Sequence, residues 1–168
     1  MKKVFDGRKF DVYAGEYRLP NNVTVYREYV DFGESVAILP IRDDEILLIK
    51  QYRMPIKKWI YEVPAGTLEK GEDPRDCAVR EMIEETGYKP REIIHLFNMY
   101  ISPGYSNEYM HVYLARDLEY VGAKPERGEL ISIDWVRLDR ALDLIRENSI
   151  EDGKSIAAIL YYIAFYRR

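Results

Sequence analysis

The sequence predicts a domain of the mixed α/β or α+β class, and three observations support this. Strand-like segments come first, one segment with helical periodicity lies in the middle, and helical segments end the chain. Hydrophobic residues make up 47% of the 168 residues, which is enough to build a core. No internal repeat or low-complexity linker is present, so we expect one compact domain, or one domain with a small annex.

The N-terminal part is predicted to form a small antiparallel sheet. Residues 10–13 and 23–29 resemble strands, and a Pro-Asn-Asn turn at residues 20–22 separates them. Proline and asparagine favour turns, so the two segments are expected to pair as a hairpin or small sheet. We therefore divide the chain into an N-terminal sheet region, residues 1–34, and a main domain, residues 35–168.

The main domain is predicted to hold several strands. Residues 36–41 and 46–51 flank the polar turn Arg-Asp-Asp-Glu, which indicates a hairpin. A short strand at 59–63 ends at Pro-Ala-Gly, residues 64–66. Further strands are expected at residues 93–101, 109–115 and 130–136.

The central helix is predicted over residues 73–86. Asp73 is a suitable N-cap, Pro74 fits the first helical position, and Gly87 is a favourable stop. One face of this helix is apolar and carries Ala78, Val79, Met82, Ile83 and Thr86. Two more helices are expected at residues 139–147 and 155–166.

Composition excludes several classes of protein. Cys77 is the single cysteine, so neither an internal disulfide nor a cysteine zinc site is expected. The 25 basic and 29 acidic residues give a net charge of −4, which does not favour a nucleic-acid or membrane surface. No apolar run approaches the roughly 20 residues of a membrane span, and no signal-peptide core follows the start. We expect a soluble cytoplasmic protein.

The central helix carries an unusual group of acidic residues. Glu81 and Glu85 lie four positions apart, with Glu84 beside them, and we expect them opposite the apolar face. Like charges at this spacing cost about 0.2–0.5 kcal/mol per pair, and Arg80 is the single basic residue between 76 and 86. A hard cation such as Mg²⁺, Mn²⁺ or Ca²⁺ would reverse that cost, with a backbone carbonyl near residues 64–66 completing the site. The alternative is an ordinary acidic surface helix.

The segment from Gly66 to Gly87 resembles the Nudix hydrolase box. Gly66, then Glu72, then residues 80–87 (Arg-Glu-Met-Ile-Glu-Glu-Thr-Gly) match its charged and glycine positions. Tyr88 departs from the family, which usually has an aliphatic residue there. The resemblance implies the Nudix fold, a mixed sheet between helices, and hydrolysis of a nucleoside diphosphate linked to another group. We also expect Arg80 to form a forked pair with Glu72.

The resemblance assigns roles to the box residues. It makes Glu81, Glu85 and the carbonyl of Ala65 ligands of Mg²⁺, with Mn²⁺ as an alternative. Glu84 is implied as a ligand, directly or through water, or as the base, and Arg80 as an orienting residue. The general base of the related branch often lies on an acidic loop before the last strand, which suggests Glu129, or Glu126 as alternate. Both could equally be ordinary loop charges.

Features outside the box resemble the ADP-ribose pyrophosphatase branch. They are Gln-Tyr-Arg at residues 51–53, the loop at residues 102–108 with its proline, and an N-terminal strand containing Arg-Glu. The resemblance implies that arginines of this chain pair with the diphosphate or the terminal ribose, and that its acidic residues accept hydrogen bonds from sugar hydroxyls or the nucleobase. The implied substrate-binding residues are Arg27, Arg53, Glu62, Pro103, Gly104 and Glu108. Surface ion pairs are the alternative for the charged ones.

The implied protein is a Mg²⁺-dependent homodimer that converts ADP-ribose to AMP and ribose 5-phosphate, with its N-terminal sheet exchanged between subunits. Rival substrates are another nucleoside diphosphate sugar such as GDP-mannose, or a dinucleotide such as FAD or a dinucleoside polyphosphate. A Nudix-fold module that senses nucleotides without cleaving them is the non-enzymatic alternative. The sequence leaves the number of metal ions and the identity of the base open.

Overall fold

The structure, a computed structural model, describes residues 1–124 and 130–167. Its large sheet is built around β4 (Glu34–Arg42), in which every residue from 35 to 41 is buried. A strand covered on both faces needs an almost unbroken apolar run, and residues 36–41 supply one. β4 pairs in parallel with β9 (Tyr109–Tyr120) and antiparallel with β5 (Glu45–Arg53).

The remaining strands extend this sheet on both sides. Its order is β10-β5-β4-β9-β8, with β10 spanning Ile131–Arg137 and β8 spanning Tyr88–Tyr100. Two short strands pair off this path: β6 (Lys58–Glu62) with β5, and β7 (Ala65–Thr67) with β4. β7 therefore brings the start of the acidic segment against the middle of the sheet.

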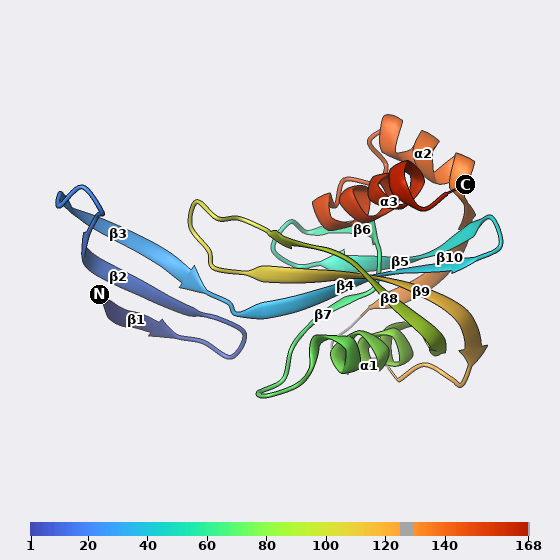
Figure 1. The fold of residues 1–168 in the computed structure, drawn as a ribbon, viewed down its shortest axis with the longest axis horizontal. Coiled ribbons are helices and arrows are strands. Elements are labelled where there is room, and N and C mark those ends of the chain that lie inside the picture. Colours follow the sequence, from blue (N-terminus) through green and yellow to red (C-terminus); the bar gives the residue numbers. More distant parts are fainter. Residues whose placement is uncertain (125–129, 168) are drawn as a thin grey trace.

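Helices cover both faces of the large sheet (Figure 1). α1 (Pro74–Thr86) lies on one face, while α2 (Leu138–Arg146) and α3 (Gly153–Phe165) lie on the other. Side chains of β4 alternate between the two layers. Val36 and Ile38 pack in the cluster of α1, and Ala37 and Leu39 pack in the cluster of α3. The predicted mixed sheet between helices is confirmed.

A three-stranded antiparallel sheet projects from the body (Figure 1), made of β1 (Lys2–Asp6), β2 (Asp11–Arg18) and β3 (Thr24–Asp31). The loop before β9 holds its base. The backbone N–H of Val30 donates to Tyr105 O at 2.8 Å, and Asn107 Oδ1 accepts the N–H of Phe32 at 2.8 Å. The N-terminal sheet is thereby tied to the loop that carries the predicted substrate-binding residues Pro103 and Gly104.

Local signals located α1 well. Asp73 accepts the N–H of Arg75 at 2.8 Å, and Gly87 ends the helix with φ of 78°. β1 was not predicted, and β8 and β9 extend further than expected because they pair with each other as far as Tyr88 and Tyr120. Among the described residues, no helix has the length and apolarity needed to cross a membrane.

Candidate active site

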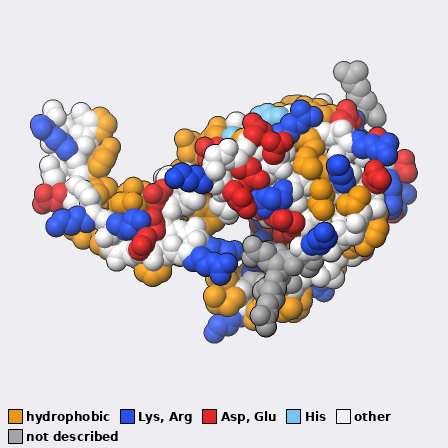
Figure 2. All heavy atoms as spheres, turned by 90° about the horizontal axis from the view of Figure 1, so that it is seen from below, with side chains coloured by type: hydrophobic (Ala, Val, Ile, Leu, Met, Phe, Trp, Pro, Cys, Tyr) orange, Lys and Arg blue, Asp and Glu red, His pale blue; other side chains and the backbone are white. Residues whose placement is uncertain are grey.

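A cavity of about 830 Å³ opens beside β7 and α1, between the base of the N-terminal sheet and the start of α3. This size lies within the usual range of small-molecule sites. Its acidic lining residues are Glu69, Glu81, Glu84, Glu85, Glu108 and Asp152, and its basic ones are Arg8, Lys9, Arg53, Arg80 and Lys154. Figure 2 shows acidic and basic side chains gathered together on the α1 side of the body. The cavity is therefore suited to a charged ligand.

The helical pattern predicted that Glu85 lies opposite the apolar face of α1, and this prediction is wrong. It is 4% exposed and belongs to the buried face, with Cys77, Ala78 and Met82. Its carboxylate Oε2 accepts the backbone N–H of Ala65 at 3.0 Å. A buried carboxylate needs such donors to offset its lost hydration, and β7 supplies one. Glu85 still borders the cavity.

Glu81 lies directly against the backbone of β7. A Cβ added at Gly66 would be 1.9 Å from Glu81 Cδ and 2.0 Å from its Oε1. Only glycine leaves room for the carboxylate in this position. The close approach explains why the predicted box needs a glycine here, and it brings Glu81 beside the main chain next to Ala65.

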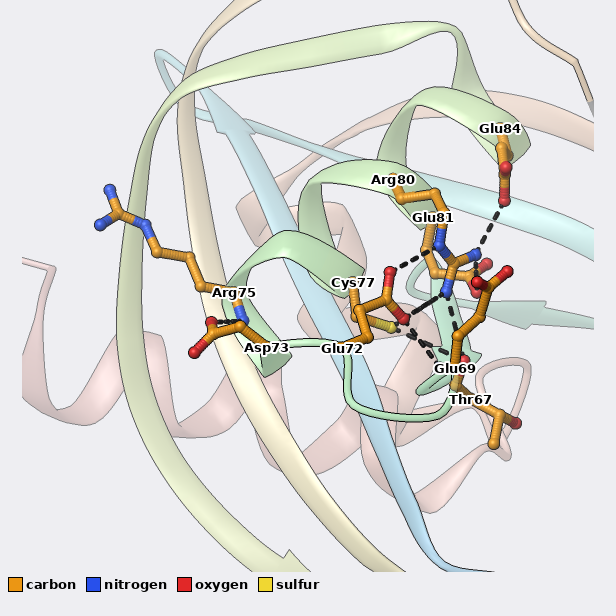
Figure 3. Close-up of polar contacts among 9 residues, drawn as sticks. All are labelled: Thr67, Glu69, Glu72, Asp73, Arg75, Cys77, Arg80, Glu81 and Glu84. Carbon is orange, nitrogen blue, oxygen red and sulfur yellow. Dashed lines mark hydrogen bonds and ion pairs between the residues drawn. The ribbon is translucent and has the colours of Figure 1, made fainter.

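Arg80 holds the loop before α1 against the helix (Figure 3). Its Nε and Nη2 donate to the two carboxylate oxygens of Glu72 at 2.8 and 3.0 Å, so the predicted forked pair is confirmed. Its Nη1 donates to Glu81 at 2.7 Å and Glu84 at 3.0 Å. The fork between Arg80 and Glu72 lowers the pKa of Glu72 to about 2 and raises the pKa of Arg80. Arg80 is thus placed to orient the other box residues.

The predicted metal ligands line one cavity without forming a ready-made cage. In the described part of the chain, no three His, Cys, Asp or Glu side chains are grouped closely enough to hold a metal ion. The guanidinium of Arg80 lies between Glu81 and Glu84 instead. The donor set nevertheless fits a hard divalent cation, because Glu81, Glu84, Glu85 and the backbone at Ala65 offer oxygen ligands around one space.

Arg53, a predicted substrate-binding residue, lines the cavity, whereas Glu62 does not. Glu62 is 1% exposed, and it accepts hydrogen bonds from Arg53 Nε at 2.5 Å and Nη2 at 2.7 Å. Lys154 forms an ion pair with the same carboxylate. Burial alone would raise the pKa of Glu62, but the bonds from Arg53 and the charge of Lys154 hold it below its usual value. Glu62 therefore lies behind the two cations.

The other predicted substrate-binding residues separate into two groups. Glu108 lines the cavity, accepts the hydroxyl of Ser35 at 3.0 Å, and has a raised pKa because it is half-buried. Arg27, Pro103 and Gly104 are exposed and do not line the cavity of this single chain. Arg27 lies on the projecting sheet, where its Nη1 donates to Tyr26 O at 2.8 Å. The candidate bases Glu126 and Glu129 lie outside the described residues.

Sequence reasoning missed several residues of the cavity. Asp152, Gly153 and Lys154 reach it from the start of α3, and Phe32 and Tyr100 add aromatic surface. The turn between β1 and β2 adds Arg8 and Lys9. The polar start of α3, Asp-Gly-Lys-Ser, was the available signal, but its position beside β6 depends on the tertiary fold.

Comparisons with known proteins agree with this geometry. The model of the NUDIX domain family matches residues 31–159. The chain is 37% identical over 163 residues to an ADP-ribose pyrophosphatase of Bacillus subtilis (strain 168), covering 95% of this chain and 88% of that protein. It is 38% identical over 163 residues to a methanol dehydrogenase activator of Bacillus methanolicus, with the same coverage. A solved structure of an ADP compounds hydrolase superposes with a TM-score of 0.86 at 23% identity, over 98% of this chain and 90% of that one, which shows a shared fold.

Proposed function

Because this chain belongs to the Nudix family, we propose that it hydrolyses the pyrophosphate bond of ADP-ribose to give AMP and ribose 5-phosphate. The predicted Nudix fold is confirmed by the family match and the superposed structure. The observation that carries the proposal is one cavity with the box carboxylates on one wall and Arg53 on another. The name of the B. subtilis relative supports ADP-ribose as the substrate.

The proposed reaction uses Mg²⁺, or Mn²⁺ in its place, held by Glu81, Glu84, Glu85 and the carbonyl of Ala65. When bound there, a divalent cation offsets the negative charge of the diphosphate and polarises its phosphorus–oxygen bonds. The protein supplies the geometry: the N–H of Ala65 orients Glu85, and Arg80 orients Glu81 and Glu84. Arg53 adds a fixed positive charge toward the diphosphate.

The general base is proposed to be one of three glutamates. Glu84 is the candidate within the described residues, where its side chain is 39% exposed and borders the cavity. Glu126 and Glu129 are the other two. Removing a general base typically costs about 10²- to 10⁴-fold in rate. The base is therefore identified as the residue whose glutamine variant loses kcat by that factor and also loses the acidic limb of the pH–rate profile.

We propose a homodimer that assembles through the N-terminal sheet. This sheet and its β2–β3 turn expose large apolar side chains, and a second copy is the simplest cover for them. The side chains are those of Val4, Phe5, Tyr17, Val23 and Tyr26. The exchange would bring Arg27 toward the cavity of the other subunit. Light scattering at assay concentration tests the proposal, and a monomer with full activity would contradict it. The cytoplasmic location stays a prediction from the sequence.

Product analysis tests the function directly. The purified chain is incubated with Mg²⁺ and, separately, ADP-ribose, GDP-mannose, FAD or a dinucleoside polyphosphate, and the products are identified by mass. Release of AMP and ribose 5-phosphate, with the highest kcat/KM on ADP-ribose, is expected. A higher kcat/KM on GDP-mannose or a dinucleotide would reject ADP-ribose. Tight binding with no turnover of any compound would instead support a sensing module.

A further inference from the structure

The start of α3 is joined to the cavity wall by a chain of buried polar contacts. Ser155 Oγ, fully buried, accepts the backbone N–H of Val63 at 2.8 Å and donates to Asp152 Oδ2 at 2.5 Å. Asp152 also caps α3 by accepting the N–H of Ser155 at 3.0 Å. These bonds fix the first turn of α3 beside the segment that leads from β6 into β7.

Lys154 is held at the cavity by two carboxylates. Its Nζ forms ion pairs with Glu62 and with Asp152 Oδ1, the latter at 3.0 Å, and its side chain is 10% exposed. Lys154 lines the same cavity as the box glutamates. A lysine so deeply covered gives up much of its hydration, so its position is set by these partners rather than by solvent.

Glu62 fixes two cations at once. Its carboxylate binds the Nε and Nη2 of Arg53 on one side and Lys154 on the other. The ammonium of Lys154 has three N–H donors, and its two carboxylate partners leave one of them for a ligand. Arg53 uses Nε and Nη2 in its fork to Glu62, so the N–H groups of its Nη1 are left for a ligand. A buried carboxylate adds little net stability, because its desolvation opposes the attraction. Its effect here is to hold two cations side by side with donors still available.

We propose that Lys154 is a substrate-binding residue that contacts phosphate oxygens of the nucleoside diphosphate together with Arg53, and that Glu62 positions both cations. This inference rests on the proposed function. Fixed N–H donors on a phosphate form short charge-assisted hydrogen bonds, and an arginine beside a lysine combines a planar fork with a point charge. Arg53 and Lys154 thereby complete a binding wall separate from the carboxylates of α1.

Three variants of the full chain test the proposal: K154Q, K154R and the control K58Q. Lys58 also pairs with a glutamate, Glu151, but its side chain is 56% exposed and lies outside the cavity lining. With Mg²⁺, K154Q is expected to raise KM for ADP-ribose at least tenfold with kcat changed less than threefold. K154R should recover most of this loss, and K58Q should match the unmodified protein.

A second readout separates binding from structure. The slope of log KM against the logarithm of the salt concentration should become shallower in K154Q, because one salt-screened contact between a cation and a phosphate is lost. The slope should stay unchanged in K58Q. A lysine that merely supported α3 would not alter this slope. If K154Q does not fold, the double variant E62Q/K154Q removes the buried carboxylate together with its partner. Because Arg53 then also loses the carboxylate that positions it, a rise in KM at least as large is expected.

The proposed function and the inference fail in different ways. If the unmodified protein does not cleave ADP-ribose, the proposed function is rejected. Calorimetric binding of inorganic pyrophosphate with Mg²⁺ then still tests Lys154, and K154Q should bind it at least tenfold more weakly. If folded K154Q keeps KM, salt slope and pyrophosphate affinity within twofold of the unmodified protein, Lys154 is structural and the inference is overturned.

Discussion

Replacing Gly66 by alanine is expected to remove most turnover while leaving stability nearly unchanged. The new Cβ would lie 1.9 Å from Glu81 Cδ and 2.0 and 2.4 Å from its carboxylate oxygens. Nonbonded carbon atoms rest about 3.5–4.0 Å apart, so the carboxylate must move by about 1.5 Å or more. It is the flexible end of a side chain, so the backbone can stay in place.

The two effects of G66A have different sizes. A displacement of about 1 Å in a catalytic constellation costs about 100-fold in rate, which corresponds to about 2.7 kcal/mol. The free energy of unfolding should change by about 1 kcal/mol or less, because alanine also restricts the unfolded chain. The assays are kcat/KM on ADP-ribose across a Mg²⁺ titration, and urea unfolding followed by circular dichroism.

G71A is the matched control, because it should lose stability and keep its turnover. Gly71 has φ of +80°, and a Cβ there meets no atom within 4 Å. Alanine in this left-handed conformation costs about 1–2 kcal/mol of stability, yet no site residue must move, so kcat/KM of the folded protein should persist. If G66A keeps more than one third of the original kcat/KM, the close packing of Glu81 on Gly66 has no catalytic role.

Three further predictions follow from the same site. Arg80 lowers the pKa of Glu72 to about 2, so the stability that this pair contributes is complete above pH 4.5 and is lost as the pH falls toward 2. In urea titrations, E72Q should lower the free energy of unfolding at pH 7 by about 1–3 kcal/mol and should flatten its dependence on pH. An unchanged dependence of the free energy of unfolding on pH would contradict this prediction. Burial raises the pKa of the Cys77 thiol to about 12, although Arg80 Nη2 lies 3.3 Å from its sulfur. The thiol reagent DTNB at pH 8 should therefore label Cys77 only after unfolding. Rapid labelling of Cys77 in the native protein would be evidence against this prediction. E85Q should lower metal-dependent turnover by far more than tenfold, a factor that corresponds to about 1.4 kcal/mol of activation free energy. Its circular dichroism spectrum should stay unchanged, because the amide oxygen of glutamine can still accept the N–H of Ala65. A loss of less than tenfold would remove Glu85 from the proposed metal ligands.

Prediction from the sequence succeeded where a residue acts on its own backbone or near neighbours. Asp73 and Gly87 bound α1 because a cap and a left-handed stop are local devices. The fork between Arg80 and Glu72 spans only eight residues, across one loop and two helical turns. The strand ends were less predictable, because β8 and β9 continue for as long as each has the other to pair with.

By itself, the sequence determined the family, the helix that carries the box, and the mixed α and β character of the fold. The tertiary structure alone decided that Glu85 of helix α1 faces inward, because its burial depends on the N–H that Ala65 offers from strand β7. It also decided that Lys154 meets Glu62 across 92 positions of the chain. Periodicity reports how a residue is oriented within its own element, whereas contacts between elements depend on how the sheet and helices pack, and no local pattern encodes that packing.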